Sequence, residues 1–141
     1  MAVHSKASTV WNGSLADGSG TTTLATGAAT LAVDWKARAE GSESTTTPEE
    51  LLAAAHASCY SMALSNALSE IGSPPEQIEA SAVVTFVPGE GVRSSVITVS
   101  ARVPGIDQLK FSEIAEEAKD GCPVSQALAG VHISLESATL L

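Results

Sequence analysis

The chain has 141 residues, a length that fits one compact domain with its own hydrophobic core. Sixteen acidic residues against seven basic ones give a net charge of −9, which excludes the clustered Lys and Arg that nucleic acid or an anionic membrane surface would require. Aromatic residues make up only 4% of the chain, so we expect a core of aliphatic side chains that lets backbones approach closely.

The sequence near the N-terminus predicts that the protein stays in the cytoplasm. It begins MAVHSKASTVWNGS and lacks the apolar stretch of about 7 to 15 residues that a secretion signal contains. No apolar run reaches the roughly 18 residues needed to span a bilayer. Because the cytosol keeps thiols reduced, we expect the chain's two cysteines, Cys59 and Cys122, to be free or catalytic thiols.

The first 40 residues favour β-strands. Apolar and polar residues alternate there, and the Asn-Gly and Asp-Gly pairs between the alternating segments are typical of tight turns. We therefore expect three strands, the third of them over residues 29–40 with Arg38 near its end. The polar segment 41–47 then breaks the alternation and is expected to form a loop.

A long helix is predicted over residues 48–71. Thr47 suits the N-cap position, Pro48 suits the first helical position, and Glu50 completes the capping-box pattern. Gly72, followed by a serine and two prolines, ends the helix. A helix of this length extends for about 36 Å.

The remaining residues predict a hairpin, two helices and a last strand. Two alternating segments, 78–88 and 92–104, flank a Gly-Glu-Gly turn. Asp107 suits the N-cap of the next helix, and Pro123 suits the first turn of a short helix before the final strand. This order of strands and helices indicates an α+β fold in a single domain, residues 1–141, rather than a doubly wound parallel sheet.

The positions of the two cysteines favour different roles. A free thiol has a pKa of about 8.5, so a reactive cysteine needs a nearby cation or a helix N-terminus to become a thiolate. Cys122 lies just before a helix start, where unpaired N–H groups favour a thiolate, whereas Cys59 lies about three turns inside the long helix. Position alone therefore favours Cys122 as the nucleophile, unless a cation reaches Cys59. Three arginines are available, Arg38, Arg93 and Arg102, and proximity along the chain favours Arg38.

Four segments of the sequence carry a resemblance to a known family. They are WNG near the start, WKARAEG, TPEELLAAAHASCYSMAL around Cys59 and KDGCPVSQAL around Cys122, and together they resemble the OsmC-type branch of the OsmC/Ohr family over nearly the whole chain. The resemblance implies an OsmC-like fold, in which antiparallel sheets wrap around a long central helix and two chains form an intertwined homodimer. Two positions differ from the common family pattern: Thr47 replaces a frequent Asn, and Ser58 replaces a frequent Ala.

The same resemblance implies a thiol-dependent peroxidase that reduces organic hydroperoxides, and hydrogen peroxide less readily, without a metal or cofactor. By motif, Cys59 corresponds to the peroxidatic cysteine and Cys122 to the resolving one, which reverses the ranking by position. Arg38 corresponds to the partner of the thiolate, and Glu49 to the carboxylate that orients the arginine. The implied cycle passes through a Cys59 sulfenic acid and a Cys59–Cys122 disulfide, which a dithiol, usually that of a lipoylated protein, reopens.

Glu49 cannot touch Cys59 within one straight helix. The two residues share a broad face of the helix, but they are ten positions apart, which is about 15 Å along the axis. If Glu49 serves the site, we expect it to come from a second chain whose matching helix packs antiparallel, with the alanines of segment 53–57 allowing close approach. Dimerisation would then be a requirement for activity.

Two other interpretations stay open. One is a stress-linked binding protein that holds an apolar ligand and carries a latent disulfide, and the other is a purely structural disulfide. His56, one turn before Cys59, could add a soft metal ligand. Three such ligands without a Cys-x-x-Cys pattern favour a packed core histidine that makes hydrogen bonds over a zinc site.

Overall fold

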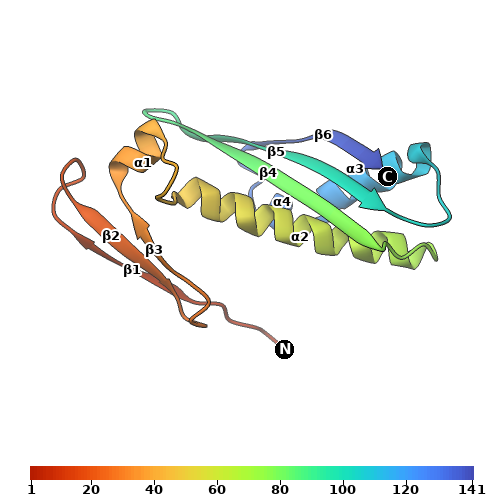
Figure 1. The fold of residues 1–141 in the computed structure, drawn as a ribbon, viewed down its shortest axis with the longest axis horizontal. Coiled ribbons are helices and arrows are strands. Elements are labelled where there is room, and N and C mark those ends of the chain that lie inside the picture. The colour runs from red at the N-terminus through yellow and green to blue at the C-terminus, as the bar shows by residue number, and fades with distance from the viewer. The chain divides into compact units, whose positions relative to one another are not determined.

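A computed structural model describes residues 1–141, and its elements follow one another as Figure 1 shows. They are β1 (Ala7–Asn12), β2 (Ser19–Leu24), β3 (Thr30–Val33), α1 (Trp35–Glu40), α2 (Pro48–Glu70), β4 (Gln77–Val87), β5 (Gly91–Arg102), α3 (Gln108–Gly121), α4 (Pro123–Ala127) and β6 (His132–Leu140). The predicted α+β class is confirmed. None of the helices has the length and apolar character needed to cross a membrane.

The elements form two compact units, Met1–Leu51 and Leu52–Leu141. The first unit holds an antiparallel sheet in the order β1-β2-β3, and the second holds a sheet in the order β4-β5-β6. The single domain expected over residues 1–141 stays a prediction, because it concerns how the two units combine.

The sheet of the first unit depends on a close contact across β1 and β2. Trp11 lies opposite Gly20 in the register of the two strands. A Cβ atom at position 20 would come within 2.8 Å of the Trp11 ring and 3.0 Å of the Val33 side chain. Glycine at this position therefore leaves room for the tryptophan ring to lie over the sheet.

The third strand is shorter than predicted. It ends at Val33, and α1 begins at Trp35, so the prediction of one strand over residues 29–40 is wrong in its second half. Asp34 is the reason, because its carboxylate accepts a hydrogen bond of 2.7 Å from the backbone N–H of Ala37 and so caps a helix. Arg38 consequently lies in the last turn of α1 rather than at the end of a strand.

The start of α2 follows the prediction, with one difference. The Thr47 hydroxyl accepts a hydrogen bond of 3.0 Å from the backbone N–H of Glu50, as an N-cap does. The Glu50 carboxylate, in contrast, accepts a hydrogen bond of 2.6 Å from the hydroxyl of Thr46. The Glu50 carboxylate therefore binds the Thr46 hydroxyl, whereas in a capping box it would accept a hydrogen bond from the backbone N–H of Thr47.

The sheet of the second unit combines two kinds of pairing. β4 and β5 form the predicted antiparallel hairpin, whereas β6 pairs with β5 in parallel. Parallel neighbours need a long crossover connection, and α3 and α4 supply it between β5 and β6. This pair is the exception among the otherwise antiparallel strands.

The main hydrophobic core lies in the second unit, between its sheet and the helices that cover one face of it (Figure 1). Alternate residues of β5 point into this core, as the two-residue period of a strand requires. The fully buried large side chains around them are Tyr60, Leu64, Leu68, Ile97 and Phe111. The Tyr60 hydroxyl donates a hydrogen bond of 2.9 Å to the Ala115 carbonyl, which ties α2 to α3.

Candidate active site

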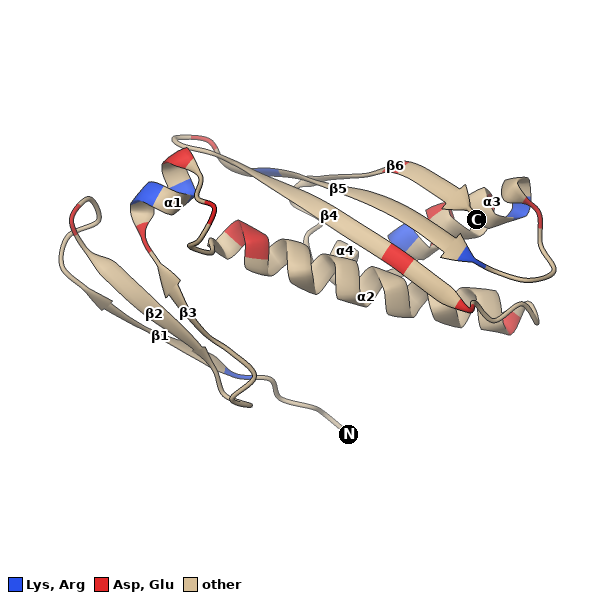
Figure 2. Cartoon of the chain, viewed as in Figure 1, with Lys and Arg blue, Asp and Glu red and all other residues tan.

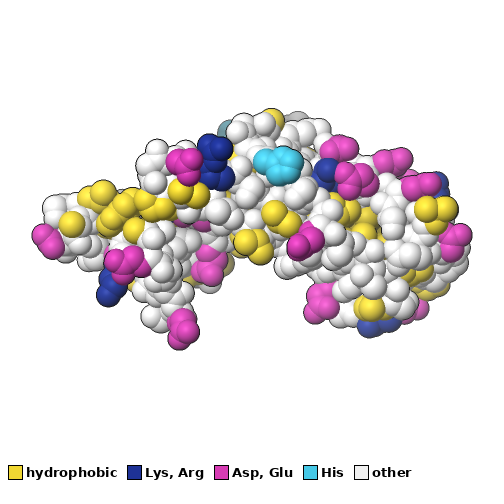
Figure 3. Space-filling model, turned by 90° about the horizontal axis from the view of Figure 1, so that it is seen from above, with side chains coloured by type: hydrophobic (Ala, Val, Ile, Leu, Met, Phe, Trp, Pro, Cys, Tyr) yellow, Lys and Arg dark blue, Asp and Glu magenta, His cyan; other side chains and the backbone are white.

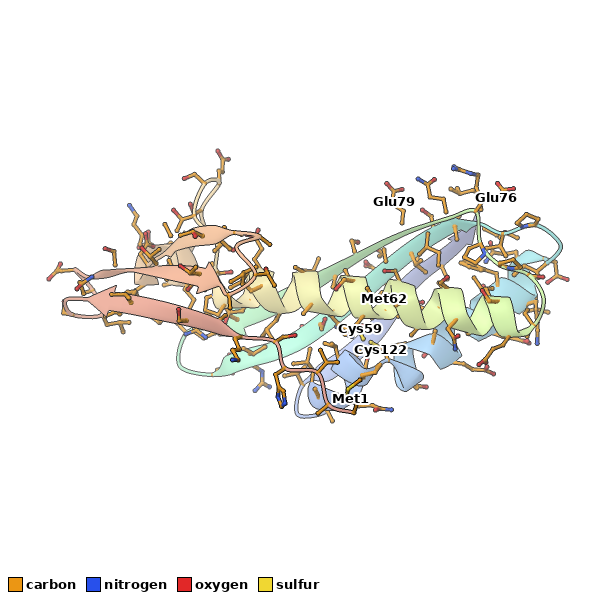
Figure 4. All side chains as sticks on the ribbon, turned by 90° about the horizontal axis from the view of Figure 1, so that it is seen from below. Met1, Cys59, Met62, Glu76, Glu79 and Cys122 are labelled. Carbon is orange, nitrogen blue, oxygen red and sulfur yellow. The ribbon has the colours of Figure 1, made fainter.

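The two cysteines lie next to each other in the second unit. Cys59 is in the middle of α2, and Cys122 is the residue that both ends α3 and precedes α4. Both are free thiols, and Figure 4 shows the two labelled side chains close together. Each thiol shifts the pKa of the other, which requires short range. The structure therefore brings together the two sulfurs that the sequence singled out, while their roles stay predictions.

The surroundings of Cys122 favour its thiolate. Burial raises the pKa of this thiol, but donors from the backbone of Ser125 and Val124, the Cys59 thiol and the Ser125 hydroxyl together outweigh burial and lower the pKa. The sulfur makes no N-cap hydrogen bond of normal geometry, so these donors act on it through longer contacts. The start of α4 thus acts on Cys122 as its position in the sequence predicted.

The surroundings of Cys59 favour the neutral thiol. Burial raises the pKa of Cys59, and the neighbouring Cys122 raises it further, against a lowering contribution from the Val124 backbone N–H. Within the second unit, the surroundings therefore favour ionisation of Cys122 over that of Cys59. A peroxidatic Cys59 would need a cation from elsewhere to reverse this order.

Arg38 and Glu49 form an ion pair in the first unit. The guanidinium donates from Nη2 and Nε to one carboxylate oxygen at 2.8 and 3.1 Å, and from Nε to the other at 3.3 Å. Glu49 is only 5% exposed, although it lies in the first turn of a helix. Figure 2 marks the basic positions of α1 and the acidic start of α2 that supply the pair. The carboxylate thereby fixes the direction of the guanidinium, as expected for an orienting residue.

An apolar groove of about 330 Å³ lies beside Arg38 in the first unit. Its lining is mostly apolar and includes Trp11, Leu15, Val33, Trp35, Pro48 and Leu51. Trp11 and Leu15 are 39% and 60% exposed, and Figure 3 shows hydrophobic side chains gathered over this part of the chain. A groove that combines apolar walls with one guanidinium suits a ligand with an alkyl chain and a polar head.

His56 is a packed core histidine, as predicted. Its ring is fully buried, and its two nitrogens lie 2.6 Å from the Ser95 hydroxyl and 2.7 Å from the Ser125 hydroxyl. Burial lowers the pKa of His56, so the ring is neutral at neutral pH. The structure has no group of three or more His, Cys, Asp or Glu side chains placed to bind a metal ion.

The sequence interpretation missed Ser95 and Ser125. Both serines are buried, and they come from β5 and α4, far from His56 along the chain. One local signal was available, because Ser125 is the third residue after Cys122 at a helix start and such a residue faces the N-cap side chain.

Comparisons with known proteins agree with the fold. The model of the family described as OsmC-like protein matches residues 41–136. Peroxiredoxin OsmC of Escherichia coli strain K12 is 39% identical over 132 residues, which cover 91% of this chain and 92% of the relative. Peroxiredoxin OsmC of Shigella flexneri gives the same values.

Two solved structures illustrate the similarity in fold. The organic hydroperoxide resistance protein OhrB of Bacillus subtilis has a TM-score of 0.66 and 25% identity, with 94% of this chain and 97% of that chain covered. The OsmC like protein of Mycoplasma pneumoniae has a TM-score of 0.73 and 15% identity over the full length of both chains.

Proposed function

The chain belongs to the OsmC-like protein family, and from this premise we propose that it is a thiol-dependent peroxidase that reduces organic hydroperoxides to alcohols, and hydrogen peroxide less readily. Its relatives in two bacteria are named peroxiredoxins, which supports a peroxide as the oxidising substrate. The observation that carries the proposal is the pair of adjacent free thiols, Cys59 and Cys122, each of which shifts the pKa of the other.

The proposed cycle uses each sulfur once. The Cys59 thiolate attacks the terminal oxygen of the hydroperoxide, the O–O bond breaks, and a sulfenic acid forms on Cys59. The alkoxide that leaves takes a proton from water and becomes the alcohol. Cys122 then attacks the sulfenic sulfur, which releases water and closes a Cys59–Cys122 disulfide. A dithiol reopens the disulfide by exchange and is itself oxidised.

In this proposal, Arg38 and Glu49 act together as one ion pair. They are joined by three hydrogen-bond contacts within one chain, so a site that receives the arginine also receives its carboxylate. Because Glu49 cannot reach Cys59 of its own helix, the pair comes from a second chain in an intertwined homodimer. There the guanidinium would stabilise the Cys59 thiolate and move the negative charge from Cys122 to the peroxidatic sulfur.

The apolar groove beside Arg38 supports an organic substrate. Its lining is mostly aromatic and aliphatic, with Arg38 as a cation and the helix-capping Asp34 as a carboxylate. An alkyl chain gains free energy by leaving water for such walls, whereas hydrogen peroxide has no apolar part to bury. The groove thus accounts for a preference for organic hydroperoxides over hydrogen peroxide.

The reductant and the location follow from the same chemistry. A vicinal dithiol, such as that of a lipoylated protein, reduces a disulfide in two linked exchange steps and leaves as a ring. We place the reaction in the cytoplasm, where such thiols are kept reduced.

Mass spectrometry of the intact protein tests the cycle directly. One equivalent of an alkyl hydroperoxide should remove two hydrogens from the protein, and dihydrolipoamide should restore them. Peptide mapping should find the new bond between Cys59 and Cys122. The matched variant Cys122→Ser should instead stop at a mass gain of one oxygen on Cys59, because no thiol remains to displace it.

Two outcomes would contradict the proposal. A protein whose mass does not change with hydroperoxide has no peroxidatic thiol. A disulfide that forms but resists dihydrolipoamide is structural rather than catalytic.

The same groove supports a second candidate function, that of a binding protein for an apolar ligand with a latent disulfide. The two functions differ in turnover. A binding protein would hold an alkyl hydroperoxide without consuming it in the presence of a dithiol, whereas a peroxidase would convert many equivalents to the alcohol.

A further inference from the structure

A row of side chains connects the buried interior of the second unit to the Cys122 sulfur. It runs from Ser95 on β5 to His56 on α2 and on to Ser125 on α4, with nitrogen–oxygen distances of 2.6 and 2.7 Å. Ser125 lies in the first turn of α4, which Cys122 caps, and its hydroxyl contributes to lowering the pKa of the Cys122 thiol. The family motifs around Cys59 and Cys122 assign no role in the cysteine chemistry to either serine or to His56.

Both hydrogen-bond partners of the His56 ring are hydroxyl groups. A buried imidazole that bonds a backbone carbonyl is fixed in one tautomer, because a carbonyl only accepts hydrogen bonds. Here both ring nitrogens meet hydroxyl groups, and a hydroxyl both donates and accepts. The Ser125 hydroxyl can therefore either donate a hydrogen bond to Nε2 of His56 or accept one from it, without movement of a heavy atom.

The two directions of the row match the two protonation states of Cys122. With a neutral thiol, Cys122 donates to the Ser125 oxygen, and the Ser125 hydroxyl donates to Nε2 of His56. With a thiolate, Nε2 of His56 donates to the Ser125 oxygen, and the Ser125 hydroxyl donates to the sulfur. The second arrangement is the one that favours the thiolate of Cys122.

We propose that Ser125 is a further catalytic residue, which takes the proton of Cys122 during disulfide formation, and that His56 is the positioning residue that receives this proton through Ser125. This inference rests on the proposed peroxidase cycle. As Cys122 loses its proton to Ser125, the Ser125 proton passes to Nε2 of His56. No hydrogen bond joins Ser125 to the sulfur in the resting protein, and in the proposed step one forms as charge develops on the sulfur, as is common for catalytic hydrogen bonds.

The step balances without another reactant. The Cys122 sulfur forms a bond to the sulfur of Cys59 sulfenic acid, and the S–O bond of Cys59 breaks. The sulfenic sulfur is reduced by the electron pair that Cys122 supplies. The proton held by His56 returns through Ser125 to the departing hydroxide, which leaves as water. His56 is neutral before and after the step, in keeping with its burial.

The first test measures Cys122 alone and does not depend on peroxide. In a Cys59→Ser background, the ultraviolet absorbance of the thiolate gives the pKa of Cys122. Adding Ser125→Ala should raise that pKa, because a donor to the sulfur is lost. The matched control Ser95→Ala removes an equal hydroxyl from the other nitrogen of His56, which has no contact with the sulfur, and should raise the pKa of Cys122 less. Equal titration curves for the Ser125→Ala and Ser95→Ala proteins would overturn the assignment of Ser125.

The second test separates the two oxidation steps in the otherwise unmodified protein. Sulfenic acid on Cys59 is trapped with dimedone, and disulfide formation is followed by the loss of free thiols after rapid mixing with an alkyl hydroperoxide. Ser125→Ala should slow disulfide formation about tenfold relative to sulfenic acid formation, the loss expected for one hydrogen bond to a charged atom. Ser125→Thr keeps the hydroxyl and should restore the rate.

His56→Gln distinguishes proton transfer from mere support of the fold. Glutamine can still bond both serines but cannot take up a proton, so disulfide formation should slow as it does in Ser125→Ala. Disulfide formation at the unmodified rate in Ser125→Ala, in a protein whose Cys59 still forms sulfenic acid, would overturn the inference while leaving the peroxidase cycle intact. Absence of sulfenic acid in the unmodified protein would overturn the cycle itself and the inference with it.

Discussion

The two units of the chain differ in how they bury their side chains and in what they contribute to the proposed chemistry. The second unit has a continuous core and holds both sulfurs, whereas only Gly20, Ala37 and Glu49 are buried in the first unit. A three-stranded sheet with so little cover is not expected to be stable alone. The first unit therefore needs a surface outside itself, which supports the proposed homodimer. In the proposed cycle it would also supply a cation, Arg38, to the sulfurs of a second chain.

The largest effect is expected when the proposed nucleophile, Cys59, is removed from the second unit. Cys59→Ser should abolish turnover of alkyl hydroperoxide with dihydrolipoamide, because a serine hydroxyl at this position does not ionise at neutral pH. The consumption of hydroperoxide measures the effect, and Ser58→Ala, an exposed neighbour on α2, is the matched control. Retained turnover in Cys59→Ser would remove this sulfur from the mechanism.

A pair of aromatic truncations compares the stability of the two units. Phe111 is fully buried in the second unit, so Phe111→Ala should lower the free energy of unfolding by about 3–5 kcal/mol. Trp11 is 39% exposed in the first unit, so Trp11→Ala should cost a single chain much less and should instead weaken association of two chains.

Two measurements separate these effects. Denaturant unfolding at low protein concentration gives the stability of each variant, and analytical ultracentrifugation gives its association. An unfolding cost for Trp11→Ala as large as that for Phe111→Ala, without any change in association, would mean that the first unit has a core of its own.

The cation of the first unit is tested by Arg38→Ala. Loss of a charge-assisted contact to the Cys59 thiolate should slow sulfenic acid formation roughly tenfold to a hundredfold. Arg38→Lys should lie in between, because an ammonium keeps the charge but not the paired donors that bind Glu49. Arg102→Ala is the control, since that side chain is half exposed and its contact with Glu76 is 4.0 Å long. An equal effect of the two alanine substitutions would exclude Arg38 as the specific partner.

Local signals predicted most of the fold, and they failed where two patterns competed. Thr47 and Asp107 mark helix starts, and both accept the expected backbone hydrogen bond in the structure. The segment 35–40 alternates polar and apolar residues like a strand, but Asp34 just before it is a helix cap. The segment forms a helix because the Asp34 carboxylate accepts a hydrogen bond from a backbone N–H of the first helical turn, which has no partner within the helix.

The sequence predicted only those residues of the candidate site that lie within recognisable motifs. The sequence contexts of Cys59 and Cys122 identified the two sulfurs. The serines that hold His56 lie 39 and 69 positions away from it along the chain, and no local pattern carries such contacts. Which of the two sulfurs holds the charge depends on burial and on donors at the start of α4, and both are tertiary effects.

The smallest expected effect concerns His56 and the pH dependence of stability in the second unit. Burial lowers the pKa of His56 below its ordinary value of 6.5. As the pH falls through that ordinary value, the unfolded chain binds a proton that the folded chain does not, so the free energy of unfolding decreases. The decrease continues down to the lowered pKa of the folded state, at no more than about 1.4 kcal/mol for each pH unit. Well above pH 6.5 the ring is neutral in both states and contributes no slope.

A variant isolates this contribution from the other titrating groups. His56→Gln removes the ring but leaves His4 and His132 in place, so a difference in slope between the two proteins belongs to His56. Denaturant unfolding between about pH 5 and pH 8 should show a shallower loss of stability on acidification in the variant, whatever its stability at neutral pH. Parallel curves would mean that the folded protein protonates His56 as readily as the unfolded chain does, which the two serine contacts and the complete burial of the ring argue against.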